Sequence, residues 1–189
     1  MRYAPTHKEE ARARLVEATG ALAKQKGFSA TGVDSLMAAA GMTSGAFYAH
    51  FRSKNELLES IVQNELRRSA QLFAAPTRAQ ALKVLKGYLS NAHVEHPESG
   101  CAVPALAPEI ARAGASTQQV FEQGVAELQA RFRDLVGDDA KAWALLAQLV
   151  GAVTVARALP PGASRGALLD GAARQVEQLL AAAPASESS

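Results

Sequence analysis

The sequence predicts an all-α protein of about nine helices. Its composition favours helix, because Ala, Leu, Glu, Gln, Lys and Arg dominate while aromatic residues make up only 5%. Apolar residues also recur three and four positions apart along most of the 189 residues, and no segment shows the alternation of a strand. A chain of this length suits two connected helical domains, an N-terminal one of three helices and a larger C-terminal one.

The first helix is expected to begin after an N-terminal arm of residues 1–6 and to end at Gly27. Phe28 follows this glycine and can supply the apolar contact that often accompanies a glycine stop. Lys24 and Lys26 occupy the last turn, where positive charge complements the helix dipole. Both lysines are therefore interpreted as capping residues.

Two short helices joined by a glycine turn are expected next. Thr31 and Asp34 have the spacing of a helix cap. Gly41 lies just past the last apolar residue of the repeat, where a left-handed backbone stops a helix. Thr43 can cap a second helix over residues 44–50. Two short helices with this separation predict a helix-turn-helix motif.

The side chains on the outer side of this motif indicate its function. Phe47 and Phe51 fall on one side of the second helix and are expected to be buried, which leaves hydroxyls, an imidazole and an ammonium outside. These groups donate hydrogen bonds to phosphate oxygens, and they form no catalytic set. The predicted DNA-contacting residues are Thr31, Thr43, Ser44, Gly45, Ala46, Tyr48, His50 and Lys54.

Positive charge is concentrated in the same part of the chain. Up to Lys54 there are eight Lys and Arg residues against four Asp and Glu, whereas the remainder has twelve against fourteen. Some of the basic residues near the N-terminus either meet phosphates at the edge of a groove or form a solvated helix face, and both interpretations stay open. These residues are Arg2, Lys8, Arg12 and Arg14.

The motifs resemble the TetR/AcrR family of transcriptional regulators over roughly residues 8 to 60. The matching elements are Ala40-Gly41, Thr43, Tyr48-Ala49-His50-Phe51, Ser53-Lys54 and Glu56-Leu57. The resemblance implies a homodimeric repressor that binds a palindromic double-stranded DNA operator and leaves it when a small-molecule effector binds the C-terminal domain. Ser44 stands where the family often has a longer side chain, so specificity is expected to depend on DNA shape, on Thr43 or on Thr31.

A long fourth helix is expected to start at a capping box of Ser53 and Glu56 and to connect the two domains. A tilt of this helix would move the DNA-contacting residues, which makes it the expected transmission element. Later helices are expected at about 78–95, 104–112, 117–136, 139–159 and 165–182. The predicted parts are a DNA-binding domain over 1–52, a ligand-binding and dimerisation domain over 53–183 and a disordered tail over 184–189.

The helix expected over 139–159 is apolar on nearly all sides, so it requires burial on more than one face. Together with the last helix it is expected to form a two-fold, four-helix contact with a second copy, a use of these helices that the family resemblance also implies. A monomer with a large internal core is the alternative. The predicted interface residues are Trp143, Ala144, Ala147, Gly151, Val155, Leu168, Ala172, Val176 and Leu179.

A regulator that responds to a small molecule needs a site whose affinity differs between two states. The C-terminal domain offers apolar residues with a few polar groups, the usual lining of such a pocket. Each of these residues alone is more often part of a packed core or of the surface. The candidate pocket residues are Tyr88, His93, Cys101, Leu106, Phe121, Leu128, Phe132 and Gln148.

Cys101 supports more than one interpretation. It follows Gly100 just before an expected helix, whose dipole favours a thiolate. A Gly-Cys pair also resembles one branch of the family, in which some members respond to electrophiles through a cysteine, and the effector would then be electrophilic. A buried cysteine that acts as a small hydrophobic residue is the simpler alternative. A metal site with His93 and His96 is a weaker third.

The chain is expected to be cytoplasmic and to have no membrane partner. Its N-terminus lacks the apolar core of a signal peptide, and the longest uncharged stretch, residues 142–156, is shorter than the roughly 20 residues that span a bilayer. No cofactor or metal is expected. Two other function classes stay open: a helical protein-interaction module without specific DNA binding, and an enzyme, although no Ser-His-Asp set or phosphate-binding glycine loop is visible.

Overall fold

The computed structural model describes residues 5–74 and 77–182, and all regular elements in these two stretches are helices. The all-α prediction is confirmed. Arg2 and the predicted tail lie outside the described residues. Within them the chain forms ten α-helices and one 3-10 helix, η1. In order they are α1 (Pro5–Lys26), α2 (Val33–Ala39), η1 (Ser44–Ala46), α3 (Phe47–His50), α4 (Lys54–Leu72), α5 (Arg78–Tyr88), α6 (Asn91–Glu95), α7 (Val103–Ile110), α8 (Ala115–Val136), α9 (Asp139–Ala158) and α10 (Ala163–Ala181).

The described residues contain one α-helix more than predicted, because the single helix expected over residues 78–95 is two helices. α5 ends at Tyr88, and Leu89 leaves the helical region with a ψ of 37°. Ser90 then caps α6, since its Oγ accepts a hydrogen bond from the backbone N–H of His93 at 3.2 Å. A serine hydroxyl competes for backbone donors and so favours a break of this kind.

Two compact units make up the fold, and each combines segments that are distant in the sequence. The first contains Met1–Leu66 and Pro97–Glu122, and the second contains Arg67–His96 and Gln123–Ser189. Helices α4 and α8 therefore each contribute residues to both units. The predicted division after residue 52 concerns where the functions lie, and it stays a prediction.

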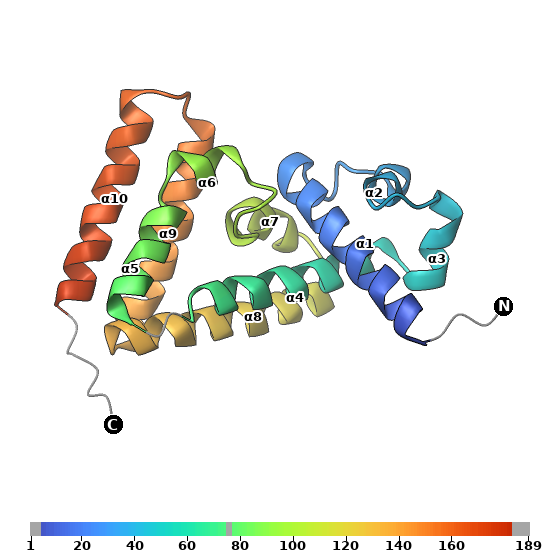
Figure 1. The fold of residues 1–189 in the computed structure, drawn as a ribbon, viewed down its shortest axis with the longest axis horizontal. Helices are drawn as coiled ribbons and strands as arrows, with labels where there is room; N and C mark the ends of the chain where they lie inside the picture. The colour runs from blue at the N-terminus through green and yellow to red at the C-terminus, as the bar shows by residue number, and fades with distance from the viewer. Residues whose placement is uncertain (1–4, 75–76, 183–189) are drawn as a thin grey trace. The chain divides into compact units, whose positions relative to one another are not determined.

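In the first unit, α1 packs against both α2 and α7 (Figure 1). Burial of a large apolar side chain typically contributes about 1.5–3 kcal/mol, so this core, rather than helix propensity, holds the single turn of α3 in place. The apolar core side chains that are at most 1% exposed in this unit are Leu15, Ala23, Leu36, Met37, Phe47, Phe51, Leu57, Ile61, Val62, Leu66 and Leu106.

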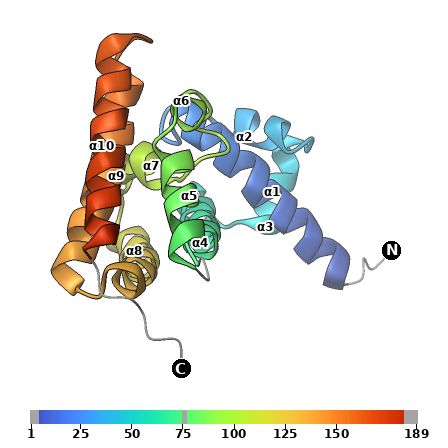
Figure 2. The same cartoon turned by 60° about the vertical axis from the view of Figure 1, so that its left-hand side comes forward.

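In the second unit, α10 packs along α9 (Figure 2). α10 also contacts α5, and α6 contacts α9. The inner side of α9 is fully buried at Leu145 and Val153, both 0% exposed. Val94 of α6, Ala156 of α9 and Leu169 of α10 form one buried cluster. Helices α6, α9 and α10 therefore share an apolar contact within this unit.

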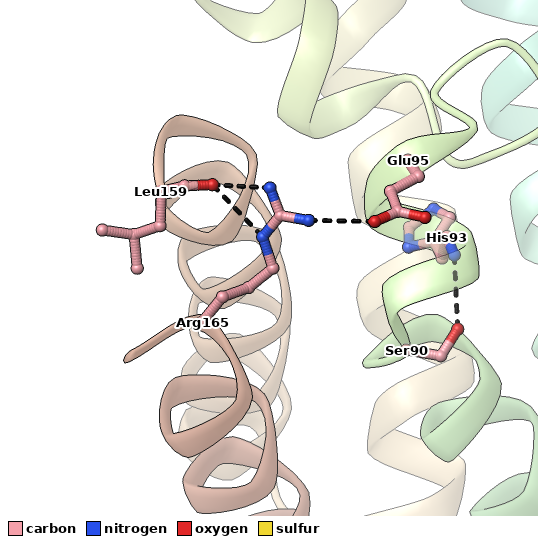
Figure 3. A network of polar contacts seen from close by, with 5 residues as sticks. All are labelled: Ser90, His93, Glu95, Leu159 and Arg165. Atoms are coloured by element: carbon pink, nitrogen blue, oxygen red, sulfur yellow. Dashed lines mark hydrogen bonds and ion pairs between the residues drawn. The ribbon is translucent and has the colours of Figure 1, made fainter. Parts of the chain in front are cut away.

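Arg165 connects α6 to the turn between α9 and α10 (Figure 3). The residue is 7% exposed, and two nitrogens of its guanidinium donate to the carbonyl oxygen of Leu159. The third nitrogen donates to Oε1 of Glu95 at 3.1 Å. A guanidinium suits this double role because its donors are fixed in a planar fork. The contact fixes the position of α6 within the second unit.

By length and composition alone, α9 is long and apolar enough to cross a membrane. The expectation that no segment is long enough to span a bilayer rests on the uncharged residues 142–156 alone. It does not hold for the whole helix, Asp139–Ala158. Core helices of water-soluble proteins meet the same criterion, and 39% of the apolar window of α9 is buried. Contacts with α6 and α10 account for one side of the helix, and its other side needs a separate explanation.

Candidate nucleic-acid interface

The predicted glycine turn of the helix-turn-helix motif is confirmed. α2 ends at Ala39, and Gly41 has a φ of 68°, in the left-handed region that glycine adopts without strain. The N–H of Gly41 donates to the carbonyl oxygen of Ala38 at 3.0 Å, and the N–H of Met42 donates to that of Met37 at 2.9 Å. These two bonds form a Schellman motif, which satisfies the last carbonyl groups of α2.

The start of α2 differs from the prediction. Gly32 occupies the N-cap position, and no side chain caps the helix. Thr31, the predicted cap, is 6% exposed, and its hydroxyl donates to the carbonyl oxygen of Gly27 at 2.6 Å. The hydroxyl therefore stabilises the preceding turn. The structure does not place Thr31 on the exposed face with the other predicted DNA-contacting residues.

The second helix of the motif has two parts instead of the single helix predicted over 44–50. It begins as the 3-10 helix η1 and continues as one turn of α-helix in α3. Thr43 has the extended backbone of an N-cap, but its side chain makes no capping hydrogen bond, so the predicted cap is absent. The exposed Thr43 hydroxyl consequently stays accessible to other partners.

Burial of two aromatic rings turns the opposite side of this helix outward. Phe47 and Phe51 are each 1% exposed, as predicted, and their ring centroids lie 5.9 Å apart. Tyr48 is 77% exposed, and its ring centroid lies 5.2 Å from that of Phe47 in an edge-on arrangement. Ala46 is half-buried. The residues exposed near Tyr48 in the sequence are Thr43, Ser44, Gly45 and Ala49.

The predicted capping box at the start of α4 is present. The Oγ of Ser53 accepts a hydrogen bond from the backbone N–H of Glu56 at 3.1 Å. The Glu56 carboxylate accepts a hydrogen bond from the backbone N–H of Arg52 at 2.8 Å. In the usual capping box this donor would be the N–H of Ser53, one residue later. The box therefore fixes the direction in which α4 leaves the motif.

Lys54, the first residue of α4, is held near the turn that follows α1. Its Nζ donates to the carbonyl oxygen of Ser29 at 3.3 Å and lies 4.9 Å from the ring centroid of Phe28. The second contact is within the range of a cation–π interaction. Because Lys54 is only half-buried, its ammonium can still meet an anion, from a position that this turn determines.

His50 ends α3 and is half-buried. Its Nδ1 atom is buried and makes no hydrogen bond within the protein. Burial, followed by the positive charges of Lys8 and Arg12, holds the pKa of His50 below its usual value of 6.5. The imidazole is therefore neutral at pH 7, and it contributes hydrogen-bonding capacity to this surface without contributing charge.

The basic residues of α1 divide between inner and outer positions. The Arg12 guanidinium lies 4.5 Å from the ring centroid of Phe51 and donates to Oγ of Ser60 at 2.8 Å. It thereby connects α1 to α4 and packs on the aromatic core of the motif. Lys8 and Arg14 are exposed, so they keep the outward position that a phosphate contact requires.

The segment that forms this motif also matches a known family. Residues 15–61 match the family profile described as "Bacterial regulatory proteins, tetR family". This is a TetR-family helix-turn-helix domain. The match spans the glycine turn, the exposed Tyr48 and Lys54, so the resemblance inferred from the motifs is confirmed. A comparison with curated proteins gave no match.

Solved structures share the fold of nearly the whole chain. The reduced form of E. coli NemR superposes with a TM-score of 0.77 at 21% identity, covering 93% of this chain and 99% of that one. A TetR-family regulator from Cytophaga hutchinsonii gives 0.76 at 17% identity, with coverages of 96% and 98%. A TetR regulator from Chloroflexus aurantiacus J-10-FL gives 0.74 at 23% identity, with coverages of 94% and 98%. At such identities the comparison shows a common fold.

The predicted interface residues of α9 form an exposed apolar stripe. Trp143 is 48% exposed and Val155 is 50% exposed. Ala144, Ala147 and Gly151 are exposed between them. A contiguous apolar surface of this kind marks an interaction site more often than an ordinary solvated face.

The predicted interface residues of α10 lie in two different environments. Leu168 and Leu179 are half-buried. Ala172 is 7% exposed and Val176 is 1% exposed, so their side chains already pack inside the second unit. A second copy would therefore meet Leu168 and Leu179 more readily than the other two residues.

The candidate pocket residues are divided between the two units. Three belong to the first unit: Cys101, Leu106 and Phe121. The others belong to the second: Tyr88, His93, Leu128, Phe132 and Gln148. Among all of them, the least exposed, at 0% or 1%, are Leu106, Leu128 and Phe132. These three fill the cores of their units, and a ligand site stays a prediction.

An aromatic group around Tyr88 occupies the second unit. The Tyr88 ring centroid lies 4.3 Å from that of His93 and 5.8 Å from that of Phe73, which in turn lies 4.9 Å from that of Phe132. The Nδ1 of His93 donates to the carbonyl oxygen of Tyr88 at 2.7 Å. Packing among these rings accounts for their burial.

Sequence reasoning missed a buried ion pair in the first unit. Lys24, interpreted as a capping residue, is 5% exposed, and its Nζ lies 2.7 Å from Oε2 of Glu65. The same Nζ donates to the carbonyl oxygen of Gly100 at 2.9 Å. These partners lie 41 and 76 residues away in the sequence, so no local pattern could identify them.

Proposed function

We propose that this TetR-family protein is a homodimeric transcriptional regulator, acting as a repressor, that binds a palindromic DNA operator in the cytoplasm. The observation that carries the proposal is the exposed face of the helix-turn-helix domain. Burial of Phe47 and Phe51 leaves Tyr48, Ser44 and Thr43 facing solvent, as a recognition helix requires. The family match of residues 15–61 supports the same assignment.

The exposed groups favour contacts with the DNA backbone over direct reading of bases. Tyr48, Thr43 and Lys54 present hydroxyls and an ammonium, which bind phosphate oxygens. Ser44 and Ala46 would meet base edges with one hydroxyl and one methyl, which gives little discrimination among base pairs. Specificity would then depend largely on DNA shape and on the spacing of two half-sites, about 34–36 Å for one helical turn.

The apolar stripe of α9 supports the homodimer. Trp143 and Val155 mark its two ends, and the alanines and glycine between them allow two helix backbones to approach closely. A second copy of the same stripe would bury these residues across a two-fold axis. The dimer would set the separation of the two recognition helices.

A small-molecule effector is the expected cause of release from DNA. Only a ligand with unequal affinity for two conformations can shift the equilibrium between them. The aromatic group around Tyr88 and His93 offers apolar and polar atoms together within the second unit. Cys101 is half-buried in the first unit, and an electrophilic effector would react there.

A direct test is the binding of the purified protein to the DNA that flanks its own coding region, measured by gel shift at several salt concentrations. We expect a sequence-selective complex whose affinity falls steeply with salt. The matched variant Tyr48→Phe removes one exposed hydroxyl and should weaken the complex without changing the fold. A chain that shifts no genomic fragment at any salt concentration would instead be a helical protein-interaction module.

A further inference from the structure

Glu109 of α7 holds the turn between α1 and α2. Its Oε1 accepts a hydrogen bond from the backbone N–H of Phe28 at 2.9 Å, and its Oε2 accepts one from the N–H of Ser29 at 2.6 Å. Oε2 also accepts from the Ser29 hydroxyl at 2.7 Å. All three residues belong to the first unit. One carboxylate therefore satisfies two successive backbone donors about 80 residues away in the sequence.

The turn is shaped to receive this carboxylate. Gly27 has a φ of 81°, and a Cβ atom at this position would lie 3.0 Å from Oε1 of Glu109. A side chain at Gly27 would thus meet both backbone strain and a close contact. Phe28, 3% exposed, anchors the other side of the turn in the core. The predicted glycine stop after α1 is confirmed, and it also allows close approach of α7.

The same turn positions the predicted phosphate-binding lysine. The carbonyl oxygen of Ser29 accepts from Nζ of Lys54 at 3.3 Å, and the Phe28 ring lies beneath that ammonium. Each residue that Glu109 binds is therefore also a residue that Lys54 contacts. Glu109, the turn and Lys54 form a connected chain of polar contacts within one unit.

We propose that Glu109 is a positioning residue for DNA binding, which acts through the Phe28–Ser29 turn on Lys54. The inference rests on the proposed function, because Lys54 must bind phosphate for its position to matter. Residues 97–122 follow α6 along the chain and pack in the first unit. Glu109 gives this segment a contact with the DNA-binding motif that is independent of α4.

The segment has a second attachment, which differs in character. The carbonyl oxygen of Gly100 accepts from the buried ammonium of Lys24 at 2.9 Å. The bonds from Glu109 to Ser29 are exposed, so solvent can replace them more readily than the buried contact. The bonds between Glu109 and Ser29 can therefore open while the Lys24 contact keeps the segment attached.

Amide hydrogen exchange tests the contact itself. We expect Glu109→Ala to raise exchange at the Phe28 and Ser29 amides by about tenfold, because hydrogen bonds to a carboxylate are among the stronger ones. Glu109→Gln, which keeps one acceptor oxygen, should have an intermediate effect. Glu59→Ala is the matched control, since Oε1 of Glu59 accepts from Oγ of Ser116 at 2.6 Å in the same unit without touching the turn.

A double-mutant cycle tests the route through Lys54. We expect Glu109→Ala to weaken binding to flanking-region DNA by about three- to tenfold when Lys54 is present. In the Lys54→Ala background the same substitution should weaken binding by less than about twofold. Thermal unfolding of each variant checks that the DNA affinities are all measured on folded protein. A general loss of structure would lower affinity equally in both backgrounds.

The outcomes separate this proposal from the function on which it rests. Suppose that the unaltered protein binds DNA. Unchanged amide exchange at Phe28 and Ser29 in Glu109→Ala then overturns the role of Glu109 alone. An equal loss of DNA affinity from Glu109→Ala in both backgrounds does the same. No binding by the unaltered protein overturns the proposed function and the role of Glu109 with it. Exchange then still decides whether the contact exists in solution.

Discussion

The Nζ of Lys24 lies 2.7 Å from Oε2 of Glu65, and their side chains are only 1% and 4% exposed. Such a pair offsets the large cost of burying each charge, so loss of one partner leaves the other uncompensated. The pair joins α1 to α4, and the same ammonium binds Gly100. Its integrity therefore holds three segments of the first unit together.

Replacement of Lys24 by Met should destabilise the protein by about 3–5 kcal/mol, measured by urea unfolding, because it leaves the Glu65 carboxylate buried without this cation. The double variant Lys24→Met/Glu65→Leu should recover much of that loss. Lys86→Met is the control, since the Lys86–Glu177 pair is 53% and 42% exposed and should contribute less than about 1 kcal/mol. Similar losses for both single variants would contradict this account.

Lys54→Ala should weaken binding to all DNA sequences and reduce the slope of log affinity against log salt by about one unit per site. The reason is that each ammonium bound to a phosphate releases one counterion. Fluorescence anisotropy at several salt concentrations measures both quantities. An unchanged slope would remove Lys54 from the phosphate-binding residues. Lys83→Ala, at an exposed position in α5, controls for the loss of one charge.

His50 should make stability fall on acidification. Its pKa in the folded state lies below the 6.5 of the unfolded chain, mainly because of burial. The unfolded chain therefore takes up the proton first as pH falls, and unfolding becomes more favourable below about pH 6.5. Urea unfolding between about pH 5 and 8 should show this loss for the unaltered protein and a smaller one for His50→Gln. Parallel pH profiles would refute the assignment.

A charge in the α9 stripe should prevent dimerisation. Val155→Glu places a carboxylate within the expected contact, at one end of the stripe, where burial without a partner is costly. We expect light scattering coupled to size-exclusion chromatography to report a monomer with unchanged helicity. Leu72→Glu is the matched control, because Leu72 is 59% exposed in α4. A Val155→Glu protein that remains dimeric would place the interface elsewhere.

The two main interpretations of Cys101 predict different responses to a thiol-reactive electrophile. A sensor cysteine would cause the treated protein to release DNA, whereas Cys101→Ser would remain bound. A cysteine that only packs would give the same behaviour in both proteins. Gel shifts before and after treatment with N-ethylmaleimide separate the two cases.

Local patterns in the sequence determined much of the DNA-binding motif. The left-handed backbone at Gly41, the burial of Phe47 and Phe51 and the Ser53–Glu56 box depend on residues within a few positions of one another. A helical repeat, a glycine stop and a cap can be identified from such short ranges because their hydrogen bonds are local. The same reasoning gave the all-α class.

Tertiary packing decided what those patterns could not. Two local hydroxyls also differed from expectation, since each had several backbone partners within reach: Thr31 bonds back to Gly27, and Ser90 interrupts the helix expected over 78–95. Lys24 and Glu109 acquired their roles from partners 41 to 81 residues away. Contacts at such separations exist only after the helices have packed, so only the tertiary structure could show that α7 holds the turn beside Lys54.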